Sequence, residues 1–318
     1  MIGDSTMANK TLDNDNQERG WGMVLQPYFT DDVIVENHAV NGRSSKSFIN
    51  EGRWKVVLDR IKPGDYVFIQ FGHNDEKPSP DRHTDPGSTF DENLSKFVRE
   101  TLERGGVPVL FNSVVRRNFY LQTDSSVDDE SLRDKEYADF DEKINSDTLV
   151  DTHGQYIISP RVVASKLQVP FVDANKLTHD IEQNLGVAGS RKLHMWFKPG
   201  EHPSIPAGRK DNTHYSVYGA HVVAGLLIDE IGRNVPSLTP YIRHYDMTVC
   251  KDGSGHFMHL QDAVDLAEKG FVPSPLGKGN VKAGNRITIY VGAGTWKKPA
   301  KALSENIELI LHKDAIIK

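Results

Sequence analysis

The sequence predicts an α/β fold in which the strands of a parallel sheet alternate with helices along the chain. Two observations support this prediction. Short apolar runs alternate with segments whose apolar residues recur at helical spacing. Polar blocks that contain glycine or asparagine follow several of these runs directly. Because ligands in such folds bind beyond the carboxyl ends of the strands, these blocks are expected to form one common site.

Each predicted strand is a short run that is apolar almost throughout, as expected for a strand covered on both faces. Such runs end at turn-forming residues, and Pro63-Gly64-Asp65 and Gly105-Gly106 are breakers that stand before two of them. The predicted strands are residues 33–40, 66–71, 107–112 and 169–173. A further strand is expected before Ser5, where only Met1 and Ile2 are present.

The predicted helices carry apolar residues three or four positions apart, so that one face of each can pack on the sheet. They cover residues 21–28, 48–61, 90–102, 156–167, 174–185 and 211–231. The charged stretch from Arg116 to Gly154 has little periodicity, and we expect an insertion over the strand ends there.

Composition excludes several classes of protein. No apolar run among the 318 residues is long enough to span a bilayer. The formal net charge of -6 disfavours non-specific binding to nucleic acid or to an anionic membrane surface. Cys250 is the only cysteine, so the chain contains no internal disulfide. No signal peptide is visible, because the first motif begins two residues after the start.

Ester hydrolysis needs a nucleophile, a base, a group that orients the base and donors for the oxyanion. Gly3-Asp4-Ser5 predicts a tight turn that leads into a helix and presents the Ser5 hydroxyl as the nucleophile. His214 is the candidate base, and Asp211 lies three residues before it, where a turn would bring the two side chains together. As alternatives, Ser5 is an ordinary helix N-cap, and Asp211 caps the last helix.

The predicted donors to the oxyanion are the amides of Ser5 and Gly42 and the side-chain amide of Asn74. Alternatively, Gly42 serves only the backbone angles of its turn. Metal binding by His73, Asp75 or His214 is a competing interpretation. Because no dense cluster of metal-ligating residues accompanies them, the sequence predicts neither a metal nor an organic cofactor.

Four ordered blocks of this sequence resemble those of the SGNH (GDSL-type) hydrolases, and in particular the rhamnogalacturonan acetylesterase-like branch. The blocks are Gly3-Asp4-Ser5-Thr6, Gly42, Gly72-His73-Asn74-Asp75 and Asp211-Asn212-Thr213-His214. Over residues 1–235, the resemblance implies a flavodoxin-like α/β/α sandwich, a Ser5-His214-Asp211 triad, and an oxyanion hole of Ser5, Gly42 and Asn74. It also implies an acetylated pectic polysaccharide as substrate, acetate as product, and a location outside the cytoplasm.

Residues 236–245 contain two prolines and are predicted to form a linker. In residues 246–318, the runs Val249 to Phe257, Leu260 to Val264 and Ile287 to Trp296 resemble the opening of a pectin methylesterase, a right-handed parallel β-helix. The expected elements are a helix at 260–267 and strands at 287–291 and 307–311, which are too few to predict an independent core with assurance. The catalytic residues of that family lie further downstream, so this segment is predicted to be non-catalytic.

Aromatic and basic residues are candidates for a substrate groove, because aromatic rings stack on sugars and arginine pairs with carboxylates. The candidates are Arg116, Arg117, Trp196, Phe197 and His202. For each of them, ordinary packing or a solvated surface is the alternative. For the whole chain, the alternatives are an esterase of acetylated xylan or of a lipid, and a non-catalytic pectin-binding protein.

Overall fold

The computed structural model describes residues 1–121, 142, 144–273 and 285–318. Its central sheet has four parallel strands in the order β1-β3-β4-β5. These are β1 (Ile2–Gly3), β3 (Tyr66–Gln70), β4 (Val107–Phe111) and β5 (Phe171–Val172). The predicted α/β fold with a parallel sheet is therefore confirmed, and β3 and β4 lie where the apolar runs placed them.

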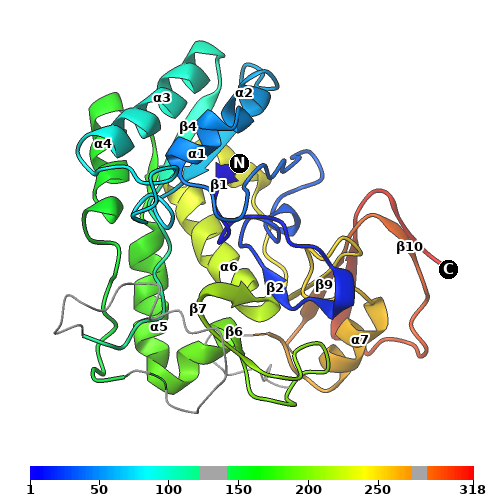
Figure 1. Ribbon diagram of the computed structural model, residues 1–318. Helices are drawn as coiled ribbons and strands as arrows, with labels where there is room; N and C mark the ends of the chain where they lie inside the picture. Colours follow the sequence, from blue (N-terminus) through cyan, green and yellow to red (C-terminus); the bar gives the residue numbers. More distant parts are fainter. Residues whose placement is uncertain (122–141, 143, 274–284) are drawn as a thin grey trace.

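Helices cover both faces of this sheet, so the region has three layers. Alternate side chains of β3 and β4 enter different apolar clusters: Phe68 and Val109 on one face, Ile69 and Leu110 on the other. Helices α1 to α4 pack on the second face, and Figure 1 shows them grouped together, apart from α6. The helices are α1 (Ser45–Asn50), α2 (Arg53–Leu58), α3 (Thr89–Glu103), α4 (Ser159–Leu167), α5 (Ala174–Ser190) and α6 (Val217–Asn234).

The strand predicted at 33–40 is not formed, although this segment lies beside β1. The amides of His38 and Val40 donate to the carbonyls of Met1 and Gly3, at 2.9 and 3.0 Å. The segment otherwise stays irregular. Since β1 has only two residues, it offers too few backbone partners for a continuous ladder.

Two of the predicted helices differ because glycine and proline interrupt them. Residues 21–28 form turns and a short 3₁₀ helix, η2 (Gln26–Tyr28), in which Pro27 stands. Their apolar spacing reflects burial against the core rather than a helix. The predicted helix at 48–61 is divided into α1 and α2 by Gly52, whose φ of 72° suits glycine.

The helix predicted to open at Asp211 begins six residues later. Residues 211–214 belong to β7 (Arg209–Ser216), which pairs antiparallel with β2 (Glu18–Arg19) and β6 (His194–Phe197). The true cap of α6 is Ser216, whose side chain accepts a hydrogen bond from the Gly219 amide. The prediction was wrong because an Asp-x-x-His block resembles a helix start, whereas pairing with β6 and β2, which lie outside the block, makes it a strand.

The remaining elements of residues 1–235 lie close to their predicted places. A 3₁₀ turn, η4 (Gly154–Ile157), precedes α4, and α5 continues past a break at Gly186. The short 3₁₀ helices η1 (Asp13–Asp15) and η5 (Arg191–Leu193) lie in connecting segments. Most of the insertion expected between Arg116 and Gly154 lies outside the described residues.

Residues 246–318 form parallel strands with a core of their own. One sheet has the order β11-β9-β8 and another pairs β10 with β12, and all of these pairs are parallel. The bounds are β8 (Met247–Val249), α7 (Leu260–Glu268), β9 (Ile287–Val291), β10 (Gly294–Trp296), β11 (Ile307–Leu311) and β12 (Ala315–Ile317). The helix and both strands expected here are therefore confirmed, and their apolar side chains form one buried cluster.

The segment predicted as a linker is packed rather than free. It forms the 3₁₀ helix η6 (Pro236–Tyr241), and Leu238 is buried in the core of the first region. The Thr30 amide donates to the Tyr241 carbonyl at 2.8 Å. Further contacts join the two regions, including stacked rings of His221 and His256 with centroids 3.6 Å apart. Of the helices in the described residues, none combines the length and apolar character that crossing a membrane requires.

Candidate active site

Ser5 lies in a turn at the carboxyl end of β1. The Asp4 carbonyl accepts from the amides of Met7 and Ala8, and the Asp4 carboxylate accepts from the amide and hydroxyl of Thr6, at 2.9 and 2.8 Å. Asp4 is fully buried, whereas Ser5 is partly exposed. The helix expected directly after Ser5 is absent, so a turn closed by Asp4 presents the hydroxyl.

A series of buried hydrogen bonds connects this turn to β3. The Trp21 indole donates to the side-chain oxygen of Gln70 at 2.6 Å, and the Gln70 amide group donates to the Thr6 hydroxyl at 2.8 Å. Gly3 allows the close approach of β1 to β3, because a Cβ there would lie 2.7 Å from the Gln70 carbonyl oxygen. Turn and sheet are thereby fixed to one another.

The side chains of Ser5, His214 and Asp211 form a continuous line. His214 Nε2 lies 2.9 Å from Ser5 Oγ, and His214 Nδ1 lies 2.9 Å from Asp211 Oδ2. The second oxygen of Asp211 accepts from the amides of Thr213 and His214, at 2.9 and 3.0 Å. Strand β7 thus holds both histidine and carboxylate, and β1 brings the serine to them. This geometry suits transfer of the serine proton to the imidazole.

The electrostatics keep the Asp211 carboxylate ionised. Burial raises its pKa, but His214 and Arg209 outweigh burial and hold that pKa well below its usual range. Asp4, the residue before Ser5, has a raised pKa because it is buried. Of these two carboxylates, Asp211 is therefore the one equipped to stabilise a protonated imidazole.

The two other predicted oxyanion donors meet at a loop beside the serine turn. Asn74 follows β3, the neighbour of β1, and its side-chain nitrogen donates to the Arg43 carbonyl at 3.2 Å. That contact leaves its second hydrogen for another acceptor. Gly42 has a φ of 75°, and a Cβ at this position would meet no atom within 4 Å. The carboxyl end of the sheet therefore brings together both segments from which donors were predicted.

Arg116 and Arg117 do not lie in an open groove. Arg116 is 3% exposed, forms an ion pair with Glu76, and donates to the His73 carbonyl at 3.2 Å. Arg117 is fully buried and pairs with Glu142. Both guanidinium groups are held by carboxylates of this chain, so the proposed pairing with a substrate carboxylate is wrong for this arrangement. The sequence showed charge but not burial.

The aromatic candidates are partly exposed, and the side chains of Trp196 and His202 are hydrogen-bonded. The Trp196 indole donates to the side-chain oxygen of Asn212 at 2.6 Å, and Arg191 lies over its ring. His202 Nδ1 lies 2.8 Å from the Ser204 hydroxyl, and its ring contacts that of Phe197. These residues flank β7, the strand that carries His214, and stay candidates for contact with a substrate.

Three charged residues in a series of contacts that begins at Asp211 were missed. Arg209 Nη2 lies 2.6 Å from Asp211 Oδ2 and 2.9 Å from Glu18 Oε2, and Glu18 Oε1 lies 2.8 Å from Lys10 Nζ. Arg209 and Asp211 share one face of β7, since they are two positions apart on a strand. Recognising residues 209–216 as a strand would have revealed that pair.

A competing metal site finds no support in the positions of its candidate ligands. Asp75 is fully buried and accepts from the amide and hydroxyl of Ser45 and from the Thr84 hydroxyl. Within the described residues, His, Cys, Asp and Glu form no group of three or more that would bind a metal ion.

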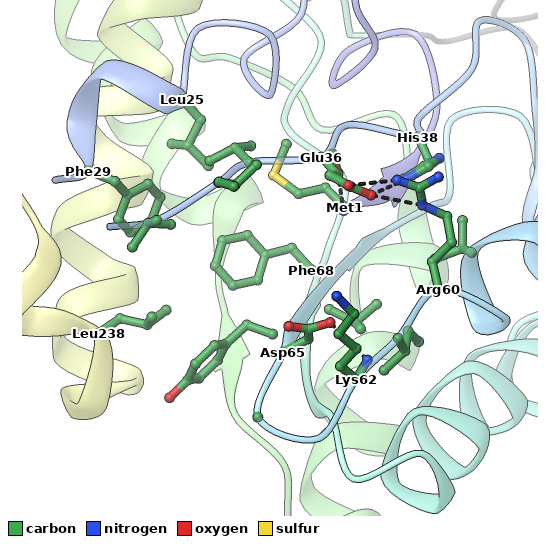
Figure 2. Close-up of a pocket in the computed structure, with 18 of the residues that line it drawn as sticks. Met1, Leu25, Phe29, Glu36, His38, Arg60, Lys62, Asp65, Phe68 and Leu238 are labelled. Carbon is green, nitrogen blue, oxygen red and sulfur yellow. Dashed lines mark hydrogen bonds and ion pairs between the residues drawn. The ribbon is translucent and has the colours of Figure 1, made fainter. Parts of the chain in front are cut away.

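A cavity of about 1080 Å³ lies at the opposite end of the sheet, where the strands begin. Figure 2 shows Met1, Phe68 and Leu238 around it, with Glu36 bonded to Arg60 and His38 at its rim. It contains none of the residues of the serine site. Because ligands of parallel sheets bind at the carboxyl ends, this cavity is not the candidate active site.

Comparison with known proteins identifies the family of this chain. Residues 1–206 match the GDSL-like Lipase/Acylhydrolase family. The rhamnogalacturonan acetylesterase RhgT of Bacillus subtilis is 37% identical over 235 residues, which are 73% of this chain and 89% of that protein. The probable rhamnogalacturonan acetylesterase YesY of the same organism is 28% identical over 73% of this chain and 92% of that protein.

Among solved structures, the Bacillus subtilis protein YxiM superposes with a TM-score of 0.56 at 24% identity. The match covers 74% of this chain but 56% of that one, so this chain spans a little over half the length of YxiM. At this identity the likeness supports the fold alone. Together, the family match and the level of identity to RhgT establish that this chain belongs to the GDSL-like lipase/acylhydrolase family.

Proposed function

We propose that this protein is a serine carbohydrate esterase that removes O-acetyl groups from a pectic polysaccharide, with no metal or organic cofactor in the reaction. The observation that carries the proposal is the position of His214, whose two ring nitrogens lie 2.9 Å from Ser5 Oγ and from Asp211 Oδ2. The names of RhgT and YesY, both rhamnogalacturonan acetylesterases, support the substrate class.

In the proposed reaction, neutral His214 donates its Nδ1 proton in a hydrogen bond to Asp211 and accepts the Ser5 hydroxyl proton at Nε2. The Ser5 oxygen attacks the acetyl carbonyl, and the proton then passes from His214 to the departing sugar oxygen. Water, deprotonated by His214, attacks the acetyl-serine, and acetate leaves as His214 returns that proton to the Ser5 oxygen. Asp211, held ionised by its surroundings, stabilises the imidazolium in both halves of the reaction.

The amides of Ser5 and Gly42 and the side-chain amide of Asn74 are the proposed donors to the oxyanion. Gly42 suits this role because the open space where its Cβ would stand lets a substrate approach the backbone. Hydrogen bonds aimed at the charge that develops in the transition state contribute more to the rate than to ground-state binding.

The substrate class is tested by measuring acetate release from acetylated rhamnogalacturonan, acetylated xylan and a long-chain lipid ester. The proposal predicts a kcat/KM for the pectic polymer that exceeds the other two by at least about tenfold. Equal rates on both polymers would support the proposed acetylesterase reaction but would contradict the assignment of a pectic substrate. Binding of the pectic polymer with no release of acetate would favour a binding protein.

For residues 246–318 we propose a non-catalytic segment built like the first turns of a parallel β-helix, with the esterase domain at 1–235 and the packed connector at 236–245. The parallel pairing of β8, β9 and β11 supports this proposal. It predicts no release of methanol from methyl-esterified pectin, and measurable release would contradict it. A location outside the cytoplasm, where such a polymer is met, stays a prediction from the resemblance.

A further inference from the structure

Three charged residues connect Asp211 with the loop that carries Gly42. Lys10 follows the serine turn, Glu18 lies in β2, and Arg209 begins β7. The side chains of Lys10 and Glu18 are 4% and 13% exposed, and that of Arg209 is 24% exposed. Buried charges of this kind are costly unless each is paired, and here each has a partner of opposite charge.

The contacts run without a break from Asp211 to the loop that carries Gly42. Arg209 Nη2 bridges Asp211 Oδ2 and Glu18 Oε2, at 2.6 and 2.9 Å. Glu18 Oε1 lies 2.8 Å from Lys10 Nζ, and that nitrogen donates to Asn41 Oδ1 at 2.7 Å. Asn41 is the residue before Gly42. One chain of ion pairs and hydrogen bonds thus joins the carboxylate that orients His214 to the proposed oxyanion loop.

We propose that Lys10, Glu18 and Arg209 are positioning residues that set the orientation and charge of Asp211 at one end and the place of the Gly42 amide at the other. The proposal rests on the proposed esterase function. None of the three reaches Ser5. They act through Asp211 and Asn41, so they govern how well the site is assembled for the transition state.

The alternating charges make this proposal specific. The charged groups that act on His214 directly are Asp211 from β7, Glu18 from β2 and Asp4 from the serine turn. Arg209 lies close to His214 because its Nη2 and the His214 Nδ1 contact the same oxygen, Asp211 Oδ2. Arg209 opposes protonation of the imidazole, and Glu18 favours it. If Arg209 and Glu18 had only a structural role, mutating either residue would destabilise the protein, and the two mutations would not shift the protonation of His214 in opposite directions.

The test is a titration of His214 by ¹H–¹⁵N NMR, together with kcat/KM for an acetyl ester against pH. Arg209→Gln removes a positive charge, so the titration midpoint and the acid limb should move to higher pH by about one unit. Glu18→Gln removes a negative charge and should move both to lower pH. Arg209→Lys keeps the charge and should restore the wild-type midpoint. Arg60→Gln, in the exposed Arg60–Glu36 pair at the far end of the sheet, is the matched control and should move neither.

Shifts in the same direction for Arg209→Gln and Glu18→Gln, or no shift in either, would overturn the proposal. The NMR titration needs no substrate, so it tests the positioning role separately from the proposed esterase function. Opposite shifts in a protein that releases no acetate from any ester would refute the proposed function and leave the positioning role intact.

Lys10 tests the end of this series of contacts that reaches the loop carrying Gly42. Lys10→Met removes the anchor of Asn41, so kcat should fall about tenfold at unchanged KM, and amide hydrogen exchange in residues 38–44 should become faster. Lys10→Arg should restore both. Unchanged exchange in Lys10→Met would show that Lys10 does not position the loop, whatever the activity.

Discussion

Each end of the central sheet carries a glutamate that is bonded to one arginine and one histidine. At the carboxyl end, Glu76 pairs with Arg116 and His153, and at the opposite end Glu36 pairs with Arg60 and His38. The pKa of each glutamate is lowered to about 2. Their surroundings differ, because the Glu76 side chain is 11% exposed and that of Glu36 is 50% exposed.

The causes of the two low pKa values differ as well. Burial raises the pKa of Glu76, and the charges of His153 and Arg116 overcome that penalty. For Glu36, hydrogen bonds from Arg60 and His38 lower the pKa with little opposition from burial. Water and salt screen the exposed pair, whereas removing one member of the buried cluster leaves uncompensated charge. The same contacts therefore stabilise the fold strongly only at the end that carries the site.

This contrast also concerns activity. Arg116 of the buried cluster donates a hydrogen bond to the carbonyl of His73, which is the residue before Asn74. The cluster therefore supports the loop from which the Asn74 amide is proposed to reach the oxyanion. No residue of the proposed triad or of the proposed oxyanion loop is among those that line the cavity at the other end.

The largest difference between the two ends should be in catalysis. Asn74→Ala removes one proposed oxyanion donor and should lower kcat by about 10²–10³-fold, with little change in KM. The measurement is steady-state hydrolysis of an acetyl ester. Asn50→Ala, at an exposed site at the end of α1, is the control and should leave kcat unchanged. An Asn74→Ala variant with normal kcat would remove Asn74 from the proposed site.

The next effect is on stability and its pH dependence. The folded pKa of Glu76 is about 2, below its usual 4.5, so ionised Glu76 stabilises the fold above pH 4.5. That stabilisation, about 3 kcal/mol, is lost as pH falls from about 4.5 to about 2. Glu76→Gln should therefore be much less stable than wild type at pH 7, and the gap should narrow in acid. Urea unfolding at several pH values measures the difference in free energy of unfolding between wild type and Glu76→Gln. A difference that stays constant with pH would contradict the electrostatic explanation.

The smallest effect should come from the exposed cluster. Glu36→Gln should lower the free energy of unfolding by less than about 1 kcal/mol, and salt should reduce the difference further. Activity should not change. If Glu36→Gln cost as much as Glu76→Gln, burial would not be what separates the two ends.

Much of the fold follows from local patterns in the sequence. β3, β4, α3 and the apolar face of α6 were predicted because continuous apolar runs and helical spacing are local signals. Residues 33–40 and 211–214 were assigned wrongly because backbone pairing with segments outside the local pattern decides their structure. The apolar spacing of Trp21, Val24 and Leu25 arose from burial of an irregular segment, which periodicity alone does not distinguish from a helix.

The site divides in the same way. Ser5, Asp211 and His214 lie in short recognisable blocks, and the structure brings their side chains together. The contact between Glu18 and Arg209 was missed because it depends on β2 meeting β7 across almost 200 residues of chain. The role of Lys10 was missed because its partner Asn41 lies 31 positions away. Arg116 and Arg117 were misassigned because the sequence does not report that internal carboxylates already hold them.

The central claim is that Ser5 is the nucleophile that His214 and Asp211 activate. Its most direct test is acetate release from acetylated rhamnogalacturonan by wild type and by Ser5→Ala, with folding of both checked by circular dichroism. The account predicts that wild type releases acetate and that Ser5→Ala loses at least about 10⁴-fold in kcat while staying folded. Near-normal release by Ser5→Ala would contradict it.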